Sequence, residues 1–178
     1  MNTDTLQTTL NVSGHVELKL YNENNELIDE RSIKNIVTYH GRSVILCRYL
    51  AVTPLATTGG DIPRYLSLGT GTTTPAVGDT SLTELGSITA RVDAGAPLRR
   101  AYNNVDVTGT SVTGTVNHVN QVIWKGTFAA GNGTNAAITE AGIFTAATGG
   151  LLFARCTFAA INKSAGSRLD IYWGLTIS

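Results

Sequence analysis

Glu140 is the side chain whose position in the sequence most needs a chemical explanation. It lies in segment 137–144, Ala-Ile-Thr-Glu-Ala-Gly-Ile-Phe, which is otherwise made of small and apolar residues and one threonine. An ionised carboxylate among such neighbours is costly unless it is paired or accepts hydrogen bonds. We expect it to pair with Arg155 in the next apolar segment or to accept from backbone amides. Catalytic carboxylate pairs meet only in space, so the sequence cannot exclude them, but we favour structural pairing over catalysis.

The other residue types that could carry out chemistry show no informative spacing. The histidines, His15, His40 and His118, have no second metal ligand at a recognised spacing. Serine and threonine are abundant, but no G-x-S-x-G nucleophile motif occurs. The sequence therefore predicts a protein that is not an enzyme and that binds no metal or cofactor.

Two cysteines, Cys47 and Cys156, lie far apart and form no CxxC motif. A disulfide between them is one alternative. Free cysteine, however, behaves mostly as a small hydrophobic residue, so we favour two buried free thiols.

The Gly/Thr-rich segment 69–79 is the second candidate site. Its glycines suggest a phosphate-binding loop, but the Gly-Lys-Ser/Thr ending is missing and Thr74 replaces the third glycine of a dinucleotide-binding motif. We therefore predict a connection between strands in which Gly69 and Gly71 adopt special backbone angles and allow a tight exit from a strand. Asp79 belongs to the turn that follows.

Composition narrows the classes of function. Thirteen basic and thirteen acidic residues give the 178-residue chain a formal net charge of zero, and charged residues make up only 15%, against about 25% in ordinary domains. Neutrality argues against nucleic-acid binding and favours association with other proteins. The chain shows neither a secretion signal nor an apolar run long enough for a membrane helix, so we expect a cytoplasmic protein that later joins an assembly.

Hydrophobic periodicity indicates the elements of the first half. Alternation from Val12 through Leu20, a polar turn at 22–26 and a second apolar run from Leu27 predict a β-hairpin. Spacing typical of a helix predicts one short helix around residues 41–51. A strand is expected at 64–68, a helical turn at 81–85, and residues 86–100 have no clear pattern.

The second half predicts a succession of strands separated by Gly-containing turns. The expected strands are 101–107, 114–117 leading into 119–128, 137–144, 151–158 and 169–177. The last alternates so regularly that it should be a central core strand. We therefore predict an all-β protein with a single β-sandwich domain over residues 11–178, jelly-roll-like or a partly closed barrel. Residues 1–10, with Leu6 and Leu10, are expected to form a flexible or partner-bound arm.

The aromatic residues allow a different function. Trp124 and Trp173, with Tyr102 and Tyr172, could form a sugar-binding platform in a carbohydrate-binding module or hydrolase. Large aromatic residues in strands are more often part of the core, and Trp173 lies on the apolar face of its predicted strand. We expect both tryptophans to be buried.

Several motifs resemble those of structural proteins in tailed-bacteriophage virions. The segment 65–84 has the form LGTGT followed by PA-x-GDT-x-L-x-x-E. Three further matching segments follow in the same order, ITEAGIF at 138–144, ARxxFxxxNK at 154–163 and LxIxW at 169–173. The likeness is good over 65–84 and 138–173 and loose over 33–178. The first hairpin also fits a V-x-L-x-L-x-x-x-x-G pattern, except that Asn25 replaces the glycine.

This resemblance implies a virion structural module rather than an active site. The motif residues Gly69, Gly71, Asp79, Glu140 and Arg155 would then define the fold or an interface. The first hypothesis is a capsid decoration (cement) protein that binds and stabilises the shell of the major capsid protein through its arm and β-sandwich. The arm at 1–10 and the loop at 69–79 are the interface candidates. The alternative is a tail, baseplate or fibre-attachment subunit. A homo-oligomer, dimer or trimer, is expected, located in the virion and without nucleic-acid or membrane partners.

Overall fold

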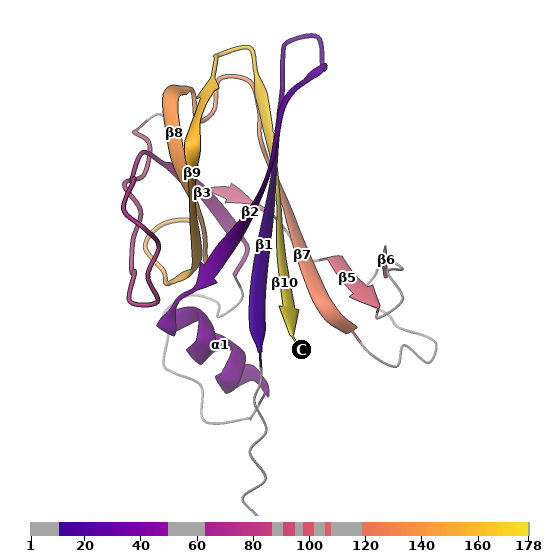
Figure 1. Ribbon diagram of the computed structural model, residues 1–178, viewed down its shortest axis with the longest axis vertical. Coiled ribbons are helices and arrows are strands. Elements are labelled where there is room, and N and C mark those ends of the chain that lie inside the picture. Colours follow the sequence, from indigo (N-terminus) through magenta and orange to yellow (C-terminus); the bar gives the residue numbers. More distant parts are fainter. Residues whose placement is uncertain are drawn as a thin grey trace, which may run out of the picture.

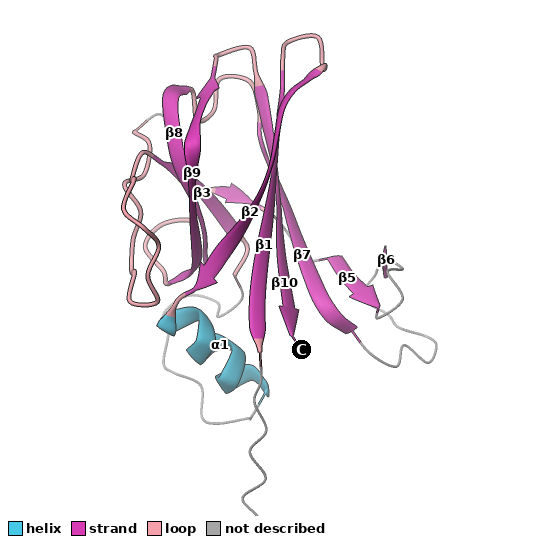
Figure 2. Cartoon of the chain, viewed as in Figure 1, coloured by secondary structure: helices cyan, strands magenta, loops and turns pink. Residues whose placement is uncertain are grey.

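Ten strands and one helix make up the described part of the chain in a computed structural model (Figures 1 and 2). The structure describes residues 11–49, 63–86, 91–94, 98–101, 106–107 and 119–177. In chain order the elements are β1 (Val12–Tyr21), β2 (Leu27–Val37), α1 (Tyr39–Tyr49), β3 (Tyr65–Gly69), β4 (Val92–Asp93), β5 (Leu98–Ala101), β6 (Asp106–Val107), β7 (Val119–Phe128), β8 (Asn135–Phe144), β9 (Leu152–Lys163) and β10 (Arg168–Ile177).

Every pairing between these strands is antiparallel, in the order β4-β3-β8-β9-β2-β1-β10-β7-β5-β6. The join between β9 and β2 is only two residue pairs long, Ile36 with Arg155 and Val37 with Ala154. The sheet therefore bends there into two leaves, as Figure 1 shows. At the other side Gly126 of β7 lies against Leu66 and Val92, so the leaves meet again. The result is a nearly closed barrel, which confirms the predicted all-β class.

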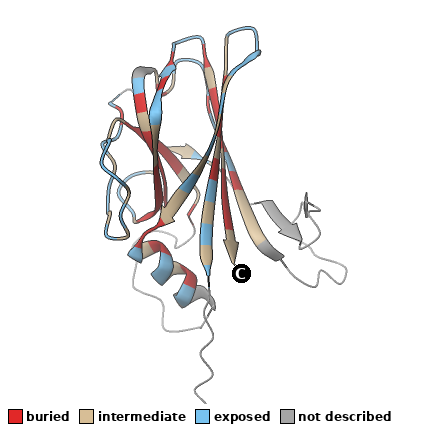
Figure 3. Ribbon diagram, in the orientation of Figure 1, coloured by how far each residue is buried: buried red, intermediate tan, exposed pale blue. Residues whose placement is uncertain are grey.

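The core lies between the two leaves, where side chains of both meet. Figure 3 shows buried residues along the strands of both leaves. On β1 the buried residues are Val16, Leu18 and Leu20, in strict alternation with polar ones. Strand β10 pairs with β1 on one side and β7 on the other, and its Trp173 is fully buried. The prediction that this strand is central is confirmed, since both of its edges are paired and Leu169, Ile171, Trp173 and Leu175 of its apolar face are all buried.

Helix α1 begins at Tyr39, two residues earlier than the spacing indicated. The reason is a capping residue, Thr38, whose Oγ1 accepts a hydrogen bond from the Gly41 amide at 3.1 Å. The same hydroxyl donates to the Leu152 carbonyl of β9 at 2.6 Å. Gly41 lies so close to the Phe153 carbonyl that no side chain fits between them. The first turn of α1 is thereby fixed on β9.

The predicted helical turn at 81–85 is wrong. This segment is extended along the end of β3, where the Thr70 amide donates to the Thr83 carbonyl at 2.9 Å and the Leu85 amide to the Leu68 carbonyl at 3.0 Å. The free edge of β3 offers backbone partners that an isolated helical turn lacks.

Some strands begin or end at other residues than predicted, because strand pairing extends further than the sequence pattern indicated. Strand β9 runs to Lys163 instead of ending at residue 158, because Ile161 and Lys163 still pair with β8. Strand β5 begins at Leu98, before the predicted start at 101. The arm at 1–10 with Leu6 and Leu10, the predicted strand 114–117 and the predicted end of the helix at 51 lie outside the described residues.

Asn25, the residue that departs from the phage-like hairpin pattern, has a positive φ of 62°. Glycine adopts this conformation most easily, and asparagine is among the few other residues that tolerate it. The substitution therefore keeps the turn that joins β1 and β2.

Candidate functional site: a buried ion cluster beneath the motif loop

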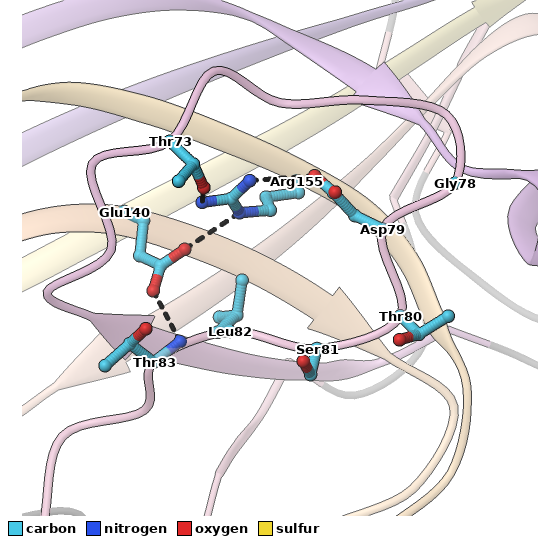
Figure 4. A pocket seen from close by; sticks show the side chains of 9 residues that line it. All are labelled: Thr73, Gly78, Asp79, Thr80, Ser81, Leu82, Thr83, Glu140 and Arg155. Atoms are coloured by element: carbon cyan, nitrogen blue, oxygen red, sulfur yellow. Dashed lines mark hydrogen bonds and ion pairs between the residues drawn. The ribbon is translucent and has the colours of Figure 1, made fainter.

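Glu140 and Arg155 lie on adjacent strands, where the motif loop (residues 70–83) crosses the sheet. Glu140 is on β8 and Arg155 is on β9, opposite Gly142, so the two side chains are diagonal neighbours on one face. Figure 4 shows the loop passing over both side chains. Neither lies at the surface, since Glu140 is 0% and Arg155 4% exposed.

The Arg155 guanidinium holds three partners. Its Nε donates to Oε2 of Glu140 at 2.8 Å, and its Nη1 donates to Oδ2 of Asp79 at 2.7 Å. Its Nη2 donates to Oγ1 of Thr73 at 3.1 Å. We call Asp79, Glu140 and Arg155 the anchor cluster, because two of these bonds end on the motif loop.

The second oxygen of Glu140 also binds the motif loop. Oε1 accepts from the backbone amides of Gly71, at 2.9 Å, and Thr83, at 2.6 Å. The two amides stand near the opposite ends of the loop, so one carboxylate fixes both. The expectation that Glu140 pairs with Arg155 or accepts from amides is confirmed, and the carboxylate does both.

Gly69 and Gly71 are needed for a different reason from the one predicted. Neither has a positive φ, so the prediction of special backbone angles is wrong. A Cβ on Gly71 would lie 2.5 Å from Oε1 of Glu140, and one on Gly69 would collide with the same oxygen and with the Thr83 carbonyl. The glycines leave room for the carboxylate to reach the loop backbone. By contrast, a Cβ on Gly78 would meet nothing within 4 Å.

The pKa values of Asp79 and Arg155 are both shifted by their surroundings. Burial by itself raises the pKa of the Asp79 carboxyl, but hydrogen bonds from the Ala76 amide and Arg155 bring that pKa below its ordinary value. Burial likewise lowers the pKa of the Arg155 guanidinium, and its bonds to Asp79 and Glu140 raise it above the ordinary value. Both shifts favour the charged forms of Asp79 and Arg155, which face each other in the ion pair.

A polar cavity of about 310 Å³ opens between the motif loop and the sheet. Figure 4 shows its lining, Thr73, Gly78, Asp79, Thr80, Ser81, Leu82, Thr83, Glu140 and Arg155. Glu140 already accepts three hydrogen bonds, and Asp79 accepts from Arg155 and from the Ala76 amide. The carboxylates of this cavity are thus held in bonds that fix the loop, which disfavours a role as a general base.

Comparisons with models of protein families, with curated proteins and with solved structures gave no match. Function must therefore be argued from this geometry and from the sequence motifs. The motif residues 69, 71, 79, 140 and 155, which come from three separate parts of the chain, meet in one place.

A second ion pair beside the loop was not predicted. Glu84 accepts from Nε of Arg91 at 3.1 Å, and from the Ser67 hydroxyl at 2.7 Å. Arg91 also donates to the Ala146 carbonyl at 3.0 Å and lies 3.3 Å above the ring centre of Phe144. The glutamate at the end of the PA-x-GDT-x-L-x-x-E pattern was the only sequence signal for it.

The tryptophans are buried as expected, Trp124 at 3% and Trp173 at 0% exposure. They are opposite each other on β7 and β10, inside the barrel. A sugar platform cannot be built from buried rings, so this finding removes the two tryptophans from the carbohydrate-binding alternative. Tyr172 is half-buried, and Tyr102 lies outside the described residues.

The remaining candidates are dispersed. Cys156 is a free, buried thiol, and burial raises its pKa to about 12, while the side chain of Cys47 lies outside the described residues. His15 lies near Ser32 on the outer face of the sheet, and His118 is outside the described ranges. Over the described ranges there is neither a group of three or more potential metal-ligating side chains nor a helix long and apolar enough to cross a membrane.

Proposed function

We propose that the protein is a non-enzymatic structural subunit of a tailed-bacteriophage virion, and that its specific role is capsid decoration. The observation that carries the proposal is the anchor cluster. The residues that the phage-protein motifs share here, Asp79, Glu140 and Arg155, bind one another and the motif loop. Charged side chains engaged in this way maintain a fold, which is what a structural module needs from its motifs.

The exposed side of the motif loop also supports a role in assembly. Thr72, Thr73 and Thr74 lie at the surface, while the backbone on both sides of them is held by Glu140. A loop fixed before binding loses little conformational freedom when a partner covers it. The zero net charge of the chain adds no long-range repulsion between subunits.

Counting the protein in purified particles tests the proposal. Particles from the bacterium that makes the protein are separated into filled heads and tails, and quantitative mass spectrometry gives the copies per particle. Binding of the purified full chain to heads is then compared with binding of a variant lacking residues 1–10. Equal thermal unfolding temperatures of the two proteins are the control for folding.

The outcomes separate the alternatives. Many copies on heads, with binding lost in the truncated variant, would support capsid decoration. A few copies that follow the tails would instead assign a tail, baseplate or fibre-attachment role. Absence from both fractions would contradict a virion function.

A further inference from the structure

The exposed large apolar side chains of the described residues form two patches. Leu27 and Ile28, 47% and 55% exposed, lie at the tip of the β1–β2 hairpin, and Tyr39 and Leu46, 61% and 48% exposed, lie on α1. Figure 1 places the hairpin tip and α1 at opposite ends of the long axis, and Figure 3 shows both as exposed. A single exposed apolar residue needs no explanation. Two neighbouring ones at each end of the molecule suggest surfaces that contact another protein.

The hairpin tip is acidic as well as apolar. Glu23 and Glu26 are exposed, and over the described ranges no ion pair involves either of them. The next acidic residues, Asp29 and Glu30, are already paired with Arg31 and Lys19. Glu26 accepts a hydrogen bond from the neutral side chain of Asn22 at 2.7 Å. We call Glu23, Glu26, Leu27 and Ile28 the hairpin patch.

The exposed stripe of α1 is basic and apolar. Tyr39, Arg42 and Leu46 follow i, i+3, i+7 spacing, which places them on one side of the helix, away from the buried Gly41 and Ile45. Arg42 is exposed and has no carboxylate within ion-pair distance among the described residues. We call these three residues the helix patch. Tyrosine and arginine are the residue types that most often dominate binding energy at protein interfaces.

We infer that copies of this chain bind one another, with the hairpin patch of one copy on the helix patch of the next. Each patch offers apolar surface and one sign of unpaired charge, and the two signs are opposite. Hairpin on hairpin or helix on helix would bring like charges together, which disfavours a contact between identical patches. Each contact therefore joins unlike patches, and it would use both patches of every copy either twice in an antiparallel two-fold dimer or head to tail in a closed ring.

The helix patch is held in place before binding. The Tyr39 amide donates to the Val77 carbonyl of the motif loop at 2.7 Å, and the Thr38 cap fixes the same turn on β9. Val77 lies in the motif loop, which the anchor cluster holds, so the cluster also supports the start of α1. A preformed patch loses less entropy on association, but two patches this small should give a weak, salt-sensitive contact.

Sedimentation velocity of the purified full chain over a range of concentrations tests the inference. We expect reversible association that weakens as salt is raised. Arg42→Glu and Glu23→Arg should each raise the dissociation constant by about tenfold or more, because each places like charges across the contact. The double variant Arg42→Glu/Glu23→Arg should recover association, as should an equimolar mixture of the two single variants.

Matched controls separate the interface from general charge effects and from misfolding. Lys125→Glu changes the charge of an exposed residue in the middle of β7 and should leave the dissociation constant within about twofold, as expected of a charge outside the contact. Leu46→Gln removes apolar surface without a change of charge and should weaken association. Circular dichroism melts establish that each variant is folded.

A wild-type chain that stays monomeric at every concentration would overturn the inference. So would association that is unchanged in both single variants, or single variants that lose association while the double variant and the mixture fail to recover it. Because the purified chain alone is measured, none of these results depends on whether the protein is found in virions.

Discussion

Strand β9 carries two buried cations in very different surroundings. Arg155 is bound by two carboxylates, Asp79 and Glu140. Lys163, 1% exposed, donates only to backbone carbonyls, those of Ala129 at 3.0 Å and Ser167 at 2.6 Å. Burial lowers the pKa of the Lys163 amine below its ordinary value, whereas the carboxylates raise the pKa of the Arg155 guanidinium.

The difference shows two uses of a buried charge. Arg155 and Glu140 fix a loop that lies far from them in the sequence, with Asp79 76 positions before Arg155. Lys163 joins two neighbouring turns, and its hydrogen bonds do not require a charge, because a neutral amine can still donate to carbonyls. Loss of one partner should therefore lower the free energy of unfolding more in the anchor cluster than at the Lys163 site.

Removal of the Glu140 carboxylate should have the largest effect. Glu140→Ala leaves Arg155 with one carboxylate and the amides of Gly71 and Thr83 without an acceptor. We expect a loss of about 3–5 kcal/mol in the free energy of unfolding, as for other buried ion pairs that lose one partner. Urea unfolding followed by tryptophan fluorescence measures it, since both tryptophans lie in the core.

Glu140→Gln is the matched control. The amide oxygen of glutamine can accept from the two loop amides, but its NH₂ group cannot accept from Arg155. We expect it to restore roughly half of the loss. Equal and small effects of both substitutions would show that the loop is not held by this carboxylate.

A methyl group at Gly71 should have the next largest effect. Gly71→Ala places a Cβ against the Glu140 carboxylate, which must move from its hydrogen bonds, at a cost of about 1–3 kcal/mol. Gly78→Ala, in the same loop but in open space, should change stability by no more than about 1 kcal/mol and is expected to be slightly stabilising. Thermal unfolding of the two variants side by side measures the difference, and similar melting temperatures would contradict the close-approach explanation.

The fold could be predicted from the sequence where one periodicity dominated. Strands β1, β7 and β10 were placed to within a residue or two, because their apolar residues alternate and glycine or polar turns border them. The segment 81–85 was misassigned because its extended form depends on backbone partners on β3, which are distant in sequence. Local propensity contains no information about such partners.

The candidate site was predicted in part. A lone glutamate in an apolar segment was enough to expect a bond to Arg155, since an unpaired buried charge is so costly. The third member, Asp79, could be singled out only as a motif residue, and its distance from Arg155 hid the ion pair. The glycines were assigned to backbone conformation, although their function is to leave space for a carboxylate that arrives from another strand.

Substitution of the lysine should have a smaller effect than substitution of Glu140. Lys163→Met keeps an unbranched side chain one atom shorter and removes the amine, so the carbonyls of Ala129 and Ser167 lose one donor each. The variant also avoids the cost of burying a charge, which offsets part of this loss. We expect a net destabilisation of about 1–2 kcal/mol by urea unfolding. A loss equal to that of Glu140→Ala would remove the distinction between the two sites.

The smallest expected effect is a pH dependence of opposite sign at the two sites. The Asp79 pKa is lowered in the folded protein from its ordinary 3.8, so its stabilisation is complete above that pH and is lost as the pH falls through the folded value. The Lys163 pKa is lowered from 10.5, so the unfolded chain binds that proton more tightly than the folded one. Stability should then increase as the pH rises from the folded pKa towards 10.5.

Difference measurements isolate each site from the other titrating groups. The stability advantage of wild type over Asp79→Asn should shrink below pH 4, because a protonated Asp79 no longer attracts Arg155. The advantage of wild type over Lys163→Met should instead grow as the pH rises from the folded pKa towards 10.5, because the neutral amine keeps its two carbonyl bonds. A stability advantage of wild type over Lys163→Met that fell with rising pH would show that the two carbonyl bonds depend on the charge of the amine. Lys163 would then stabilise the fold electrostatically, as Arg155 does.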